Sequence, residues 1–271
     1  MFGKLFKKKK EIKLLCFDLD NTLEDYGSAE SETEVYIAKL ISKDFHNKKS
    51  PNEILKVFNS IKHHHMHHDI DPRNFSRGLW IKETLLQLKL NKLNKLDKLS
   101  KLDKLDNTVS HAEKNTKTQE KTPEYYEAIY WDYIIPGIRL FPDVESTLKQ
   151  LKKSRYKLAL LTDSDGKKEI KINRINALGI SQYFDYVITT DDTGVNKPDI
   201  KNWEYILKIS GFSADQCIMI GDHPDTDLLT PKKLGFITVW TKEHLNADSH
   251  YVFVDYEIRS ITEIIGILKK L

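Results

Sequence analysis

The chain has 271 residues, of which 39% are hydrophobic and 31% are charged, and its formal net charge at pH 7 is +3. This composition is typical of a soluble globular protein with one large or two modest domains. The charge is too small to indicate nucleic-acid binding by itself, and no apolar run approaches the length of a membrane span. We therefore expect a cytoplasmic protein with neither a nucleic-acid partner nor a membrane span.

The first predicted element is an apolar strand that begins at Leu14 and leads directly into Asp18, Asp20, Asn21 and Thr22. A continuous apolar run bounded by turn-forming residues is typical of a strand buried inside a parallel sheet. Two carboxylates at its carboxyl end repel each other unless a cation or a shared proton relieves them. These residues therefore predict a metal-assisted site, although a simple polar turn would use the same residue types.

Residues 24–135 carry helical patterns, and four helices are predicted there, over residues 31–43, 51–61, 74–90 and 123–133. Ser50 and Pro51 form a helix-start signal for the second of them. The second helix leads into a cluster of five histidines between His63 and His68, for which a solvated surface is the simplest interpretation and a metal site an alternative.

Six successive Lys-Leu-x triplets follow at residues 89–106. A period of three falls about 60° short of a full turn per triplet in an α-helix, so the leucines cannot form one apolar face. Together with the polar run behind it, this segment predicts a flexible insertion over about residues 89–122, whose start continues the third helix for one or two turns. A docking arm for an acidic partner is the functional alternative.

Strands and helices alternate in the remaining sequence. The predicted strands are residues 157–162, 186–190, 217–221, 237–240 and 251–254, and the predicted helices are residues 142–151, 167–178, 199–210, 227–234 and 260–268. This alternation predicts a doubly wound α/β fold with a parallel sheet. The two cysteines, Cys16 and Cys217, fall inside predicted strands and are expected to be buried thiols of a reducing compartment rather than a disulfide or metal pair.

Polar residues also follow three of the later strands: Thr162 ends one strand, Lys197 follows another, and Asp222 and Asp227 follow a third. The ordered set that runs from Asp18 to Asp227 resembles the haloacid dehalogenase-like superfamily, in its phosphatase branch with a helical cap inserted after the first motif. The resemblance covers residues 12–23 and about 136–240. It implies an α/β catalytic core of residues 1–23 and 136–271, and a cap domain of residues 24–135 that closes over the site.

The resemblance also implies roles for individual residues. Asp18 is the expected nucleophile and Asp20 the expected general acid/base, while Thr162 and Lys197 bind the phosphoryl group. The expected Mg²⁺ ligands are Asp18, Asp20 and Asp222, with Asp227 in the outer shell of the metal.

This set of residues suits phosphoryl transfer. A carboxylate can attack phosphorus to form an aspartyl-phosphate, Mg²⁺ prefers oxygen ligands, and a lysine neutralises charge on the transferring group. The expected function is thus a Mg²⁺-dependent phosphatase acting on a small phosphorylated metabolite. Asp20 argues against carbon–halogen cleavage, because dehalogenases of the superfamily are expected to lack a carboxyl there. A phosphosugar mutase and a non-catalytic phosphate-responsive binding protein remain alternatives, and the sequence does not indicate the oligomeric state.

Three residues, in two places of the sequence, depart from the superfamily pattern. Asp163 stands where relatives often carry Asn, which adds negative charge beside the phosphate site. Thr230 and Pro231 replace small residues and are expected to delay the start of the helix after Asp227.

Overall fold

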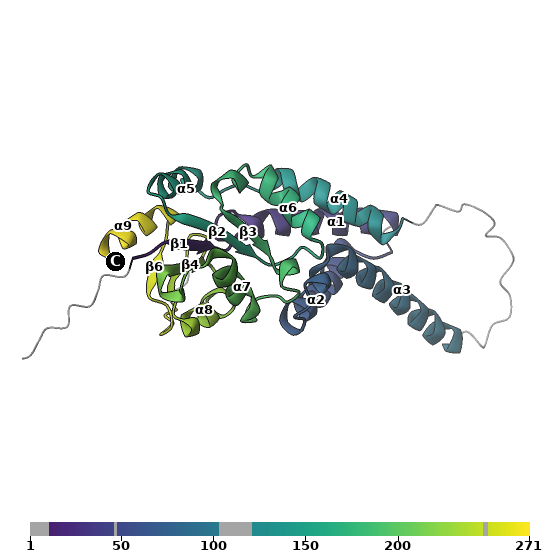
Figure 1. Ribbon diagram of the computed structural model, residues 1–271. Helices are drawn as coiled ribbons and strands as arrows, with labels where there is room; N and C mark the ends of the chain where they lie inside the picture. The colour runs from purple at the N-terminus through teal and green to yellow at the C-terminus, as the bar shows by residue number, and fades with distance from the viewer. Residues whose placement is uncertain (1–10, 46–47, 103–120, 246–248) are drawn as a thin grey trace, which may run out of the picture. The chain divides into compact units, whose positions relative to one another are not determined.

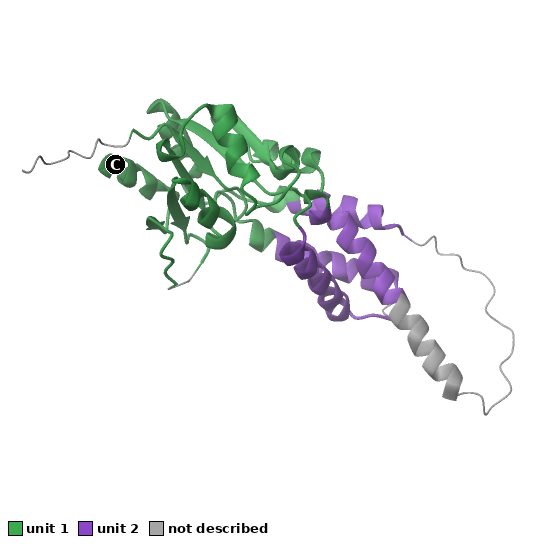
Figure 2. Ribbon diagram, turned by 60° about the horizontal axis from the view of Figure 1, so that its bottom comes forward, with its two compact units in different colours: residues 1–29, 70–73, 135–271 green, residues 30–69, 74–134 purple. Residues whose placement is uncertain are grey.

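The computed structural model describes residues 11–45, 48–102, 121–245 and 249–271, with the backbone alone for residues 90–102 (Figure 1). The chain divides into two compact units (Figure 2). The core unit comprises residues 1–29, 70–73 and 135–271, and the helical unit comprises residues 30–69 and 74–134. In the described parts of the chain, no helix combines the length and the apolar character that a membrane span requires.

The core unit contains a six-stranded parallel sheet in the order β3-β2-β1-β4-β5-β6. The strands are β1 (Leu14–Phe17), β2 (Lys157–Thr162), β3 (Tyr186–Thr189), β4 (Cys217–Gly221), β5 (Ile237–Thr241) and β6 (Tyr256–Ile258). Leu14 is in register with Lys157 of β2 and with Cys217 of β4. The carboxyl ends of these three strands therefore lie at one edge of the sheet, where open α/β folds bind their ligands.

Both faces of β1 are buried, which explains why its sequence is apolar throughout. Leu15 and Phe17 pack in one core cluster with side chains of helices α5, α6 and α9. Leu14 and Cys16 pack in a second cluster on the other face, with side chains of α7 and of the segment that contains α8. Cys16 and Cys217 are buried free thiols, as expected from the sequence, and burial raises the pKa of Cys16 well above its ordinary value.

The helices of the core unit match the predicted helices within a few residues at each end. They are α5 (Val144–Lys153), α6 (Lys168–Ala177), α7 (Lys201–Ser210), α8 (Leu229–Leu234) and α9 (Ile264–Lys270). Helix α8 begins at Leu229, two residues after the predicted start at residue 227, but it directly continues an earlier helical turn. The preceding residues, Pro224–Leu228, form a π-helical turn that contains Asp227.

The prediction of a strand at residues 251–254 is wrong. These residues are not in a strand, and the last strand, β6, follows at Tyr256–Ile258. The aromatic and β-branched residues that indicated a strand serve another purpose here, because Tyr251 packs edge-on against the ring of Trp240 while Val252 is 94% exposed.

The four helices after β1 are α1 (Tyr26–Asp44), α2 (Pro51–His68), α3 (Arg77–Leu102) and α4 (Pro123–Ile134). Ser50 and Glu53 form a capping box at the start of α2, in agreement with the predicted start signal. The α3 backbone stays helical through Leu102, further into the Lys-Leu repeat than the one or two turns expected. The rest of the predicted flexible insertion, residues 103–120, lies outside the described residues.

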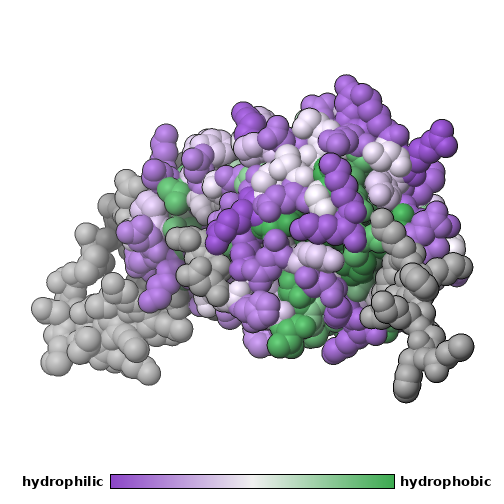
Figure 3. All heavy atoms as spheres, turned by 90° about the vertical axis from the view of Figure 1, so that its left-hand side faces the viewer, coloured by the Kyte–Doolittle hydropathy of each residue, from purple (hydrophilic) through white to green (hydrophobic). Residues whose placement is uncertain are grey.

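The surface agrees with the charged composition. On the face shown in Figure 3, hydrophilic residues cover most of the described surface and apolar residues form separate patches.

Candidate active site

The strand ends bring the sequence-predicted residues of the core together. Asp18 directly follows β1, Thr162 ends β2 and Asp222 directly follows β4. The backbone N–H of Asp18 donates a hydrogen bond to the carbonyl oxygen of Ile220, at 2.9 Å, so the ladder between β1 and β4 continues to the site itself. The regular sheet therefore fixes the starting points of the polar side chains.

Lys197 is the central cation of the site. Its Nζ lies 2.6 Å from a carboxylate oxygen of Asp18 and 2.7 Å from one of Asp227, and all three side chains are almost completely buried. Asp163 lies further away, at 3.8 Å from Nζ, but its carboxylate also accepts a hydrogen bond from the Lys197 backbone N–H. One cation thus faces several carboxylates.

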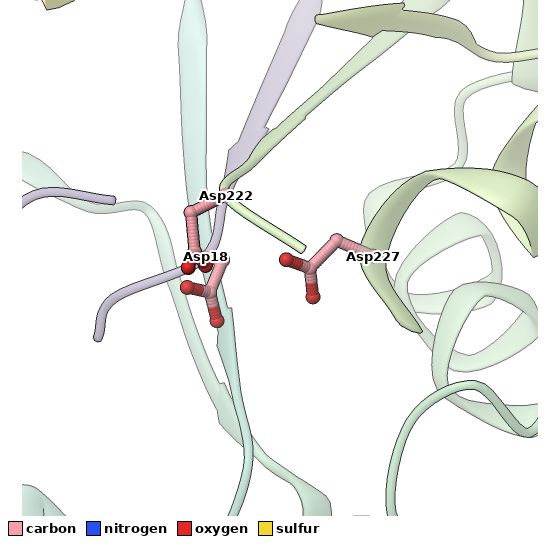
Figure 4. Close-up of side chains that lie close together, drawn as sticks. All are labelled: Asp18, Asp222 and Asp227. Carbon is pink, nitrogen blue, oxygen red and sulfur yellow. The ribbon is translucent and has the colours of Figure 1, made fainter. Parts of the chain in front are cut away.

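Asp18, Asp222 and Asp227 can each offer a carboxylate oxygen, and these oxygens all lie within 4.8 Å of one another. Figure 4 shows the Asp18 and Asp222 side chains next to each other, with the Asp227 carboxylate directed toward them. We call Lys197, Asp163 and these three aspartates the Lys197 cluster.

The Lys197 cluster has four acidic side chains and a single cation, so its positive charge does not balance its negative charge. Burial raises the pKa of Asp18 to about 7, because the opposing attraction of Lys197 is offset in part by the charges of Asp227 and Asp20. Burial, followed by the charges of Asp227 and Asp18, also raises the pKa of Asp222 well above its ordinary value. A hard divalent cation that takes oxygen ligands would relieve this repulsion, so the donor set fits Mg²⁺.

Asp227 approaches the strand end closely because Gly221 has no side chain. A Cβ at Gly221 would lie 2.5 Å from the Asp227 carboxylate oxygen Oδ2. The same oxygen accepts a hydrogen bond from the backbone N–H of His223, at 3.1 Å. The His223 side chain is exposed, so this residue contributes to the loop through its backbone.

Asp20 points into a different environment. Its two carboxylate oxygens pair with Lys171 at 2.9 Å and with Arg174 at 2.5 Å, both on α6. Burial by itself would raise the pKa of Asp20, but the charges of Arg174 and Lys171 outweigh it and hold this pKa far below the ordinary range. Among the described residues, the group that could hold a metal includes Asp227 rather than the Asp20 side chain. Metal binding by Asp20 therefore stays a prediction, as does an outer-shell place for Asp227.

Thr162 is buried at the end of β2, where its hydroxyl lies 3.5 Å from the carbonyl oxygen of Asp163. The loop after β2 is connected by hydrogen bonds to the segment that contains Lys197. The Ser164 backbone N–H donates to the hydroxyl of Thr190, which in turn donates to the side-chain oxygen of Asn196. This buried connection fixes the position of the segment just before Lys197.

A family model for haloacid dehalogenase-like hydrolases matches residues 12–235, which include every residue of the Lys197 cluster. The chain belongs to the haloacid dehalogenase-like hydrolase family. The resemblance inferred from the sequence motifs is thereby confirmed, as is the α/β fold with a helical insertion after β1.

Individual relatives point in the same direction. A glyceraldehyde 3-phosphate phosphatase of Methanocaldococcus jannaschii is 34% identical over 143 residues, which are 52% of this chain and 62% of that protein. The chain therefore matches less than two thirds of this relative's length.

Solved structures share the fold over nearly the whole chain. The haloacid dehalogenase-like hydrolase YfnB of Bacillus subtilis, solved with bound magnesium, has a TM-score of 0.66 at 19% identity and covers 96% of this chain and 100% of its own. A 2-haloacid dehalogenase of Pseudomonas syringae pv. Tomato DC3000 has a TM-score of 0.65 at 19% identity, with 96% and 99% covered. A phosphatase of the same family from Thermococcus onnurineus has a TM-score of 0.67 at 22% identity, with 95% of this chain and 98% of that chain covered. A phosphatase and a dehalogenase thus share this fold, so the fold alone does not select between phosphate-ester and carbon–halogen cleavage.

Sequence reasoning about this family member missed several residues around the site. Lys171 and Arg174 were not singled out, because charged residues in a predicted helix usually face solvent. His244 was also missed. Its Nε2 lies 3.4 Å from an oxygen of Asp222, and burial lowers its pKa, which favours the neutral ring. A weak signal existed for His244, because it follows the carboxyl end of β5, on the same edge of the sheet as the other groups.

Proposed function

We propose that this protein is a Mg²⁺-dependent phosphomonoesterase that hydrolyses a small phosphorylated metabolite through an aspartyl-phosphate. The observation that carries the proposal is the Nζ of Lys197, which is held between the carboxylates of Asp18 and Asp227 beside Asp222. A lone nucleophilic carboxylate would repel an anionic phosphate ester. In this site, a buried lysine and a set of oxygen ligands for a divalent cation surround that carboxylate.

In the first half of the proposed reaction, an oxygen of Asp18 attacks phosphorus and the bond from phosphorus to the ester oxygen breaks. Lys197 and Thr162 bind the oxygens of the transferring group, and the lysine neutralises part of their charge. Against the effect of burial, Arg174 and Lys171 hold the pKa of Asp20 far below its ordinary range, so Asp20 carries no proton before the ester binds. A monoanionic ester brings a proton into the site, and Asp20 passes this proton to the departing alkoxide, so the alcohol leaves neutral.

In the second half, a water molecule attacks the phosphorus of the aspartyl-phosphate and Asp20 accepts its proton. The bond between Asp18 and phosphorus breaks, which releases inorganic phosphate and restores the carboxylate. Mg²⁺ held by Asp18 and Asp222, with Asp227 beside it, would supply positive charge that offsets the repulsion between these carboxylates and the substrate.

The relatives support a narrower substrate class. The glyceraldehyde 3-phosphate phosphatase is 34% identical over 143 residues, about half of this chain. We therefore infer that triose phosphates and other small sugar phosphates are the preferred substrates. The mutase alternative differs in its product, because a mutase returns the phosphoryl group to the substrate instead of releasing phosphate.

The test is phosphate release from a panel of phosphate esters, with Mg²⁺ or with EDTA, by the wild type and by Asp18→Asn. We expect metal-dependent release that falls by about 10³-fold or more in the variant, because the amide cannot form the covalent intermediate. Asp185→Asn is the matched control. Asp185 also pairs with a lysine, but its carboxylate accepts a hydrogen bond from the Leu158 backbone N–H near the amino end of β2, at the opposite end of the strand from the site.

Three outcomes would contradict the proposal. Release that survives Asp18→Asn would exclude Asp18 as the nucleophile. Isomerised ester without stoichiometric phosphate would favour the mutase, and halide release from haloacids without any phosphate release would favour the dehalogenase reaction.

A further inference from the structure

A second group of charges surrounds Asp20, and the proposed function does not use most of it. We call this group the Asp20 cluster; its members are Asp20, Glu24, Asp165, Lys171 and Arg174. The Arg174 guanidinium contacts three carboxylates: Asp20 and Glu24, each at 2.5 Å, and Asp165 at 2.8 Å. Lys171 Nζ lies 2.9 Å from Asp20 and 3.3 Å from Asp165.

The members of the cluster differ sharply in exposure. The side chain of Asp20 is 27% exposed, whereas those of Lys171, Arg174, Asp165 and Glu24 are between 0% and 1% exposed. The buried charges therefore lie behind a single carboxylate that reaches solvent. This carboxylate is two residues from Asp18 and close enough to contribute to the pKa shift of Asp18.

Stability alone does not explain such an arrangement. Burying several ions costs solvation energy, and apolar side chains of similar size often stabilise a core equally well. Burial raises the pKa of Glu24 well above its ordinary value, and a neutral Glu24 leaves two carboxylates against two cations. The cluster is thus close to charge balance. Its main structural effect is to fix the orientation of the Asp20 side chain.

The contacts restrain Asp20 at both oxygens. Oδ2 accepts from Lys171, and Oδ1 accepts from Arg174. Arg174 is itself held by two hydrogen bonds to Asp165 and by the ring of Tyr26, whose centroid lies 4.1 Å from the guanidinium carbon. One turn of α6 separates the two cations, so a single rigid element sets both contacts.

We propose that Lys171 and Arg174 are positioning residues that hold the Asp20 carboxyl group in the orientation for proton transfer at the leaving oxygen. This inference rests on the proposed phosphatase function, because it assigns a task to residues behind the general acid/base. Neither α6 residue contacts the transferring phosphoryl group in this account. Both act through Asp20.

The test compares kcat/KM for two substrates, an alkyl phosphate with a poor leaving group and 2,4-dinitrophenyl phosphate with a good one. The ratio kcat/KM reports steps up to formation of the aspartyl-phosphate, and a good leaving group departs without a proton. We expect Asp20→Asn to lower kcat/KM by about 100-fold or more for the alkyl ester, and by less than about 3-fold for the dinitrophenyl ester. Removing Lys171 raises the pKa of Asp20, which by itself would favour proton donation. A loss of about 10-fold for the alkyl ester alone, which we expect in Lys171→Met, would therefore report the lost orientation of Asp20.

The double variant Asp20→Asn/Lys171→Met decides whether the lysine acts through the aspartate. If it does, the double variant loses no more activity than Asp20→Asn alone. Arg174→Lys is a second variant that keeps the charge but not the paired contacts, and it should show the same leaving-group pattern as Lys171→Met. Lys152→Met is the matched control, because Lys152 binds Asp185 at 2.6 Å far from the strand ends of the site.

Equal losses for both esters, or losses that add in the double variant, would overturn the positioning role while leaving the phosphatase function intact. A wild-type protein that releases phosphate from neither ester would instead overturn the proposed function, and the inference with it. Circular dichroism and the thermal midpoint of each variant show whether a general loss of folding accounts for a loss of activity.

Discussion

The loop after β1 contributes Asp18 to the Lys197 cluster and Asp20 to the Asp20 cluster, and the two clusters differ in charge balance. The first sets one lysine against Asp18, Asp163, Asp222 and Asp227, and the pKa values of Asp18 and Asp222 are raised. The second sets a lysine and an arginine against three acidic side chains, and the pKa of Asp20 is lowered. The cluster with too little positive charge is the one suited to receive a cation, whereas the balanced cluster is complete by itself.

Of the variants that separate the two clusters, the one that removes Lys197 should have the largest effect on activity and stability. Lys197→Met leaves Asp18 and Asp227 buried without their counter-ion, so we expect phosphate release to fall by about 10²–10³-fold. The free energy of unfolding in EDTA at pH 7.5 should decrease by about 3–5 kcal/mol. Urea unfolding and phosphate assays measure the two effects.

Lys152→Met serves again as the control, because it breaks a lysine–aspartate pair away from the site. A Lys197→Met variant that kept wild-type turnover would show that the lysine does not stabilise the transferring group.

The pH dependence of stability separates Asp18 from Asp20. The ordinary pKa of Asp18 is 3.8 and the folded value is about 7, so between these values the folded state keeps a proton that the unfolded state has lost. The free energy of unfolding should therefore fall as pH rises through this window, by up to roughly 4 kcal/mol. Asp20 has the opposite sign, because its lowered pKa gives stability that is present above its unfolded value and lost as pH falls.

Asp18→Asn isolates the contribution of Asp18. In EDTA the difference in stability should be smallest below about pH 4, where Asp18 is protonated in both the folded and the unfolded wild type. At pH 7.5 the variant should be the more stable protein, as measured by urea midpoints. Saturating Mg²⁺ should remove or reverse the difference at pH 7.5. A variant no more stable than the wild type at pH 7.5 in EDTA would refute the raised pKa.

A smaller effect is expected from Gly221→Ala, which changes the approach of Asp227 without removing a charge. The added Cβ would lie 2.5 Å from the Asp227 carboxylate, so that side chain must move away from its partners. We expect the Mg²⁺ concentration for half-maximal activity to rise by about 10-fold. Gly266→Ala is the control, since a Cβ there meets nothing within 4 Å, and an equal change in both variants would exclude the steric explanation.

Much of the core could be predicted because apolar strands and their polar ends are adjacent in the sequence. Short runs of apolar residues predict the strand that precedes Asp18 and the strand that precedes Asp222. The structure places both acids at the ends of these neighbouring strands. Helix α6 was also predicted, but its chemistry was not. Lys171 and Arg174 lie 151 and 154 positions after Asp20 in the sequence, and no local pattern marks a buried cation.

The wrong strand at residues 251–254 illustrates the same limit. Strand propensity describes side chains that fit a half-buried surface, and Tyr251 meets that condition by packing on Trp240 from outside the ladder. A solvated surface is the simplest interpretation of the five histidines between His63 and His68, and this holds for four of them, which are exposed. His65 differs, because it is buried and pairs with Asp69 and Glu83.

The place of β1 between β2 and β4 has a consequence for local opening of the fold. All four of its side chains are fully buried, and it has a hydrogen-bonded neighbour on each side. Backbone amides in such a strand exchange with deuterium only when the whole unit unfolds, whereas amides in loops and at helix ends exchange through small openings. Asp18 continues directly from this strand, so the slowest-exchanging amides should lie next to the carboxylate proposed as the nucleophile.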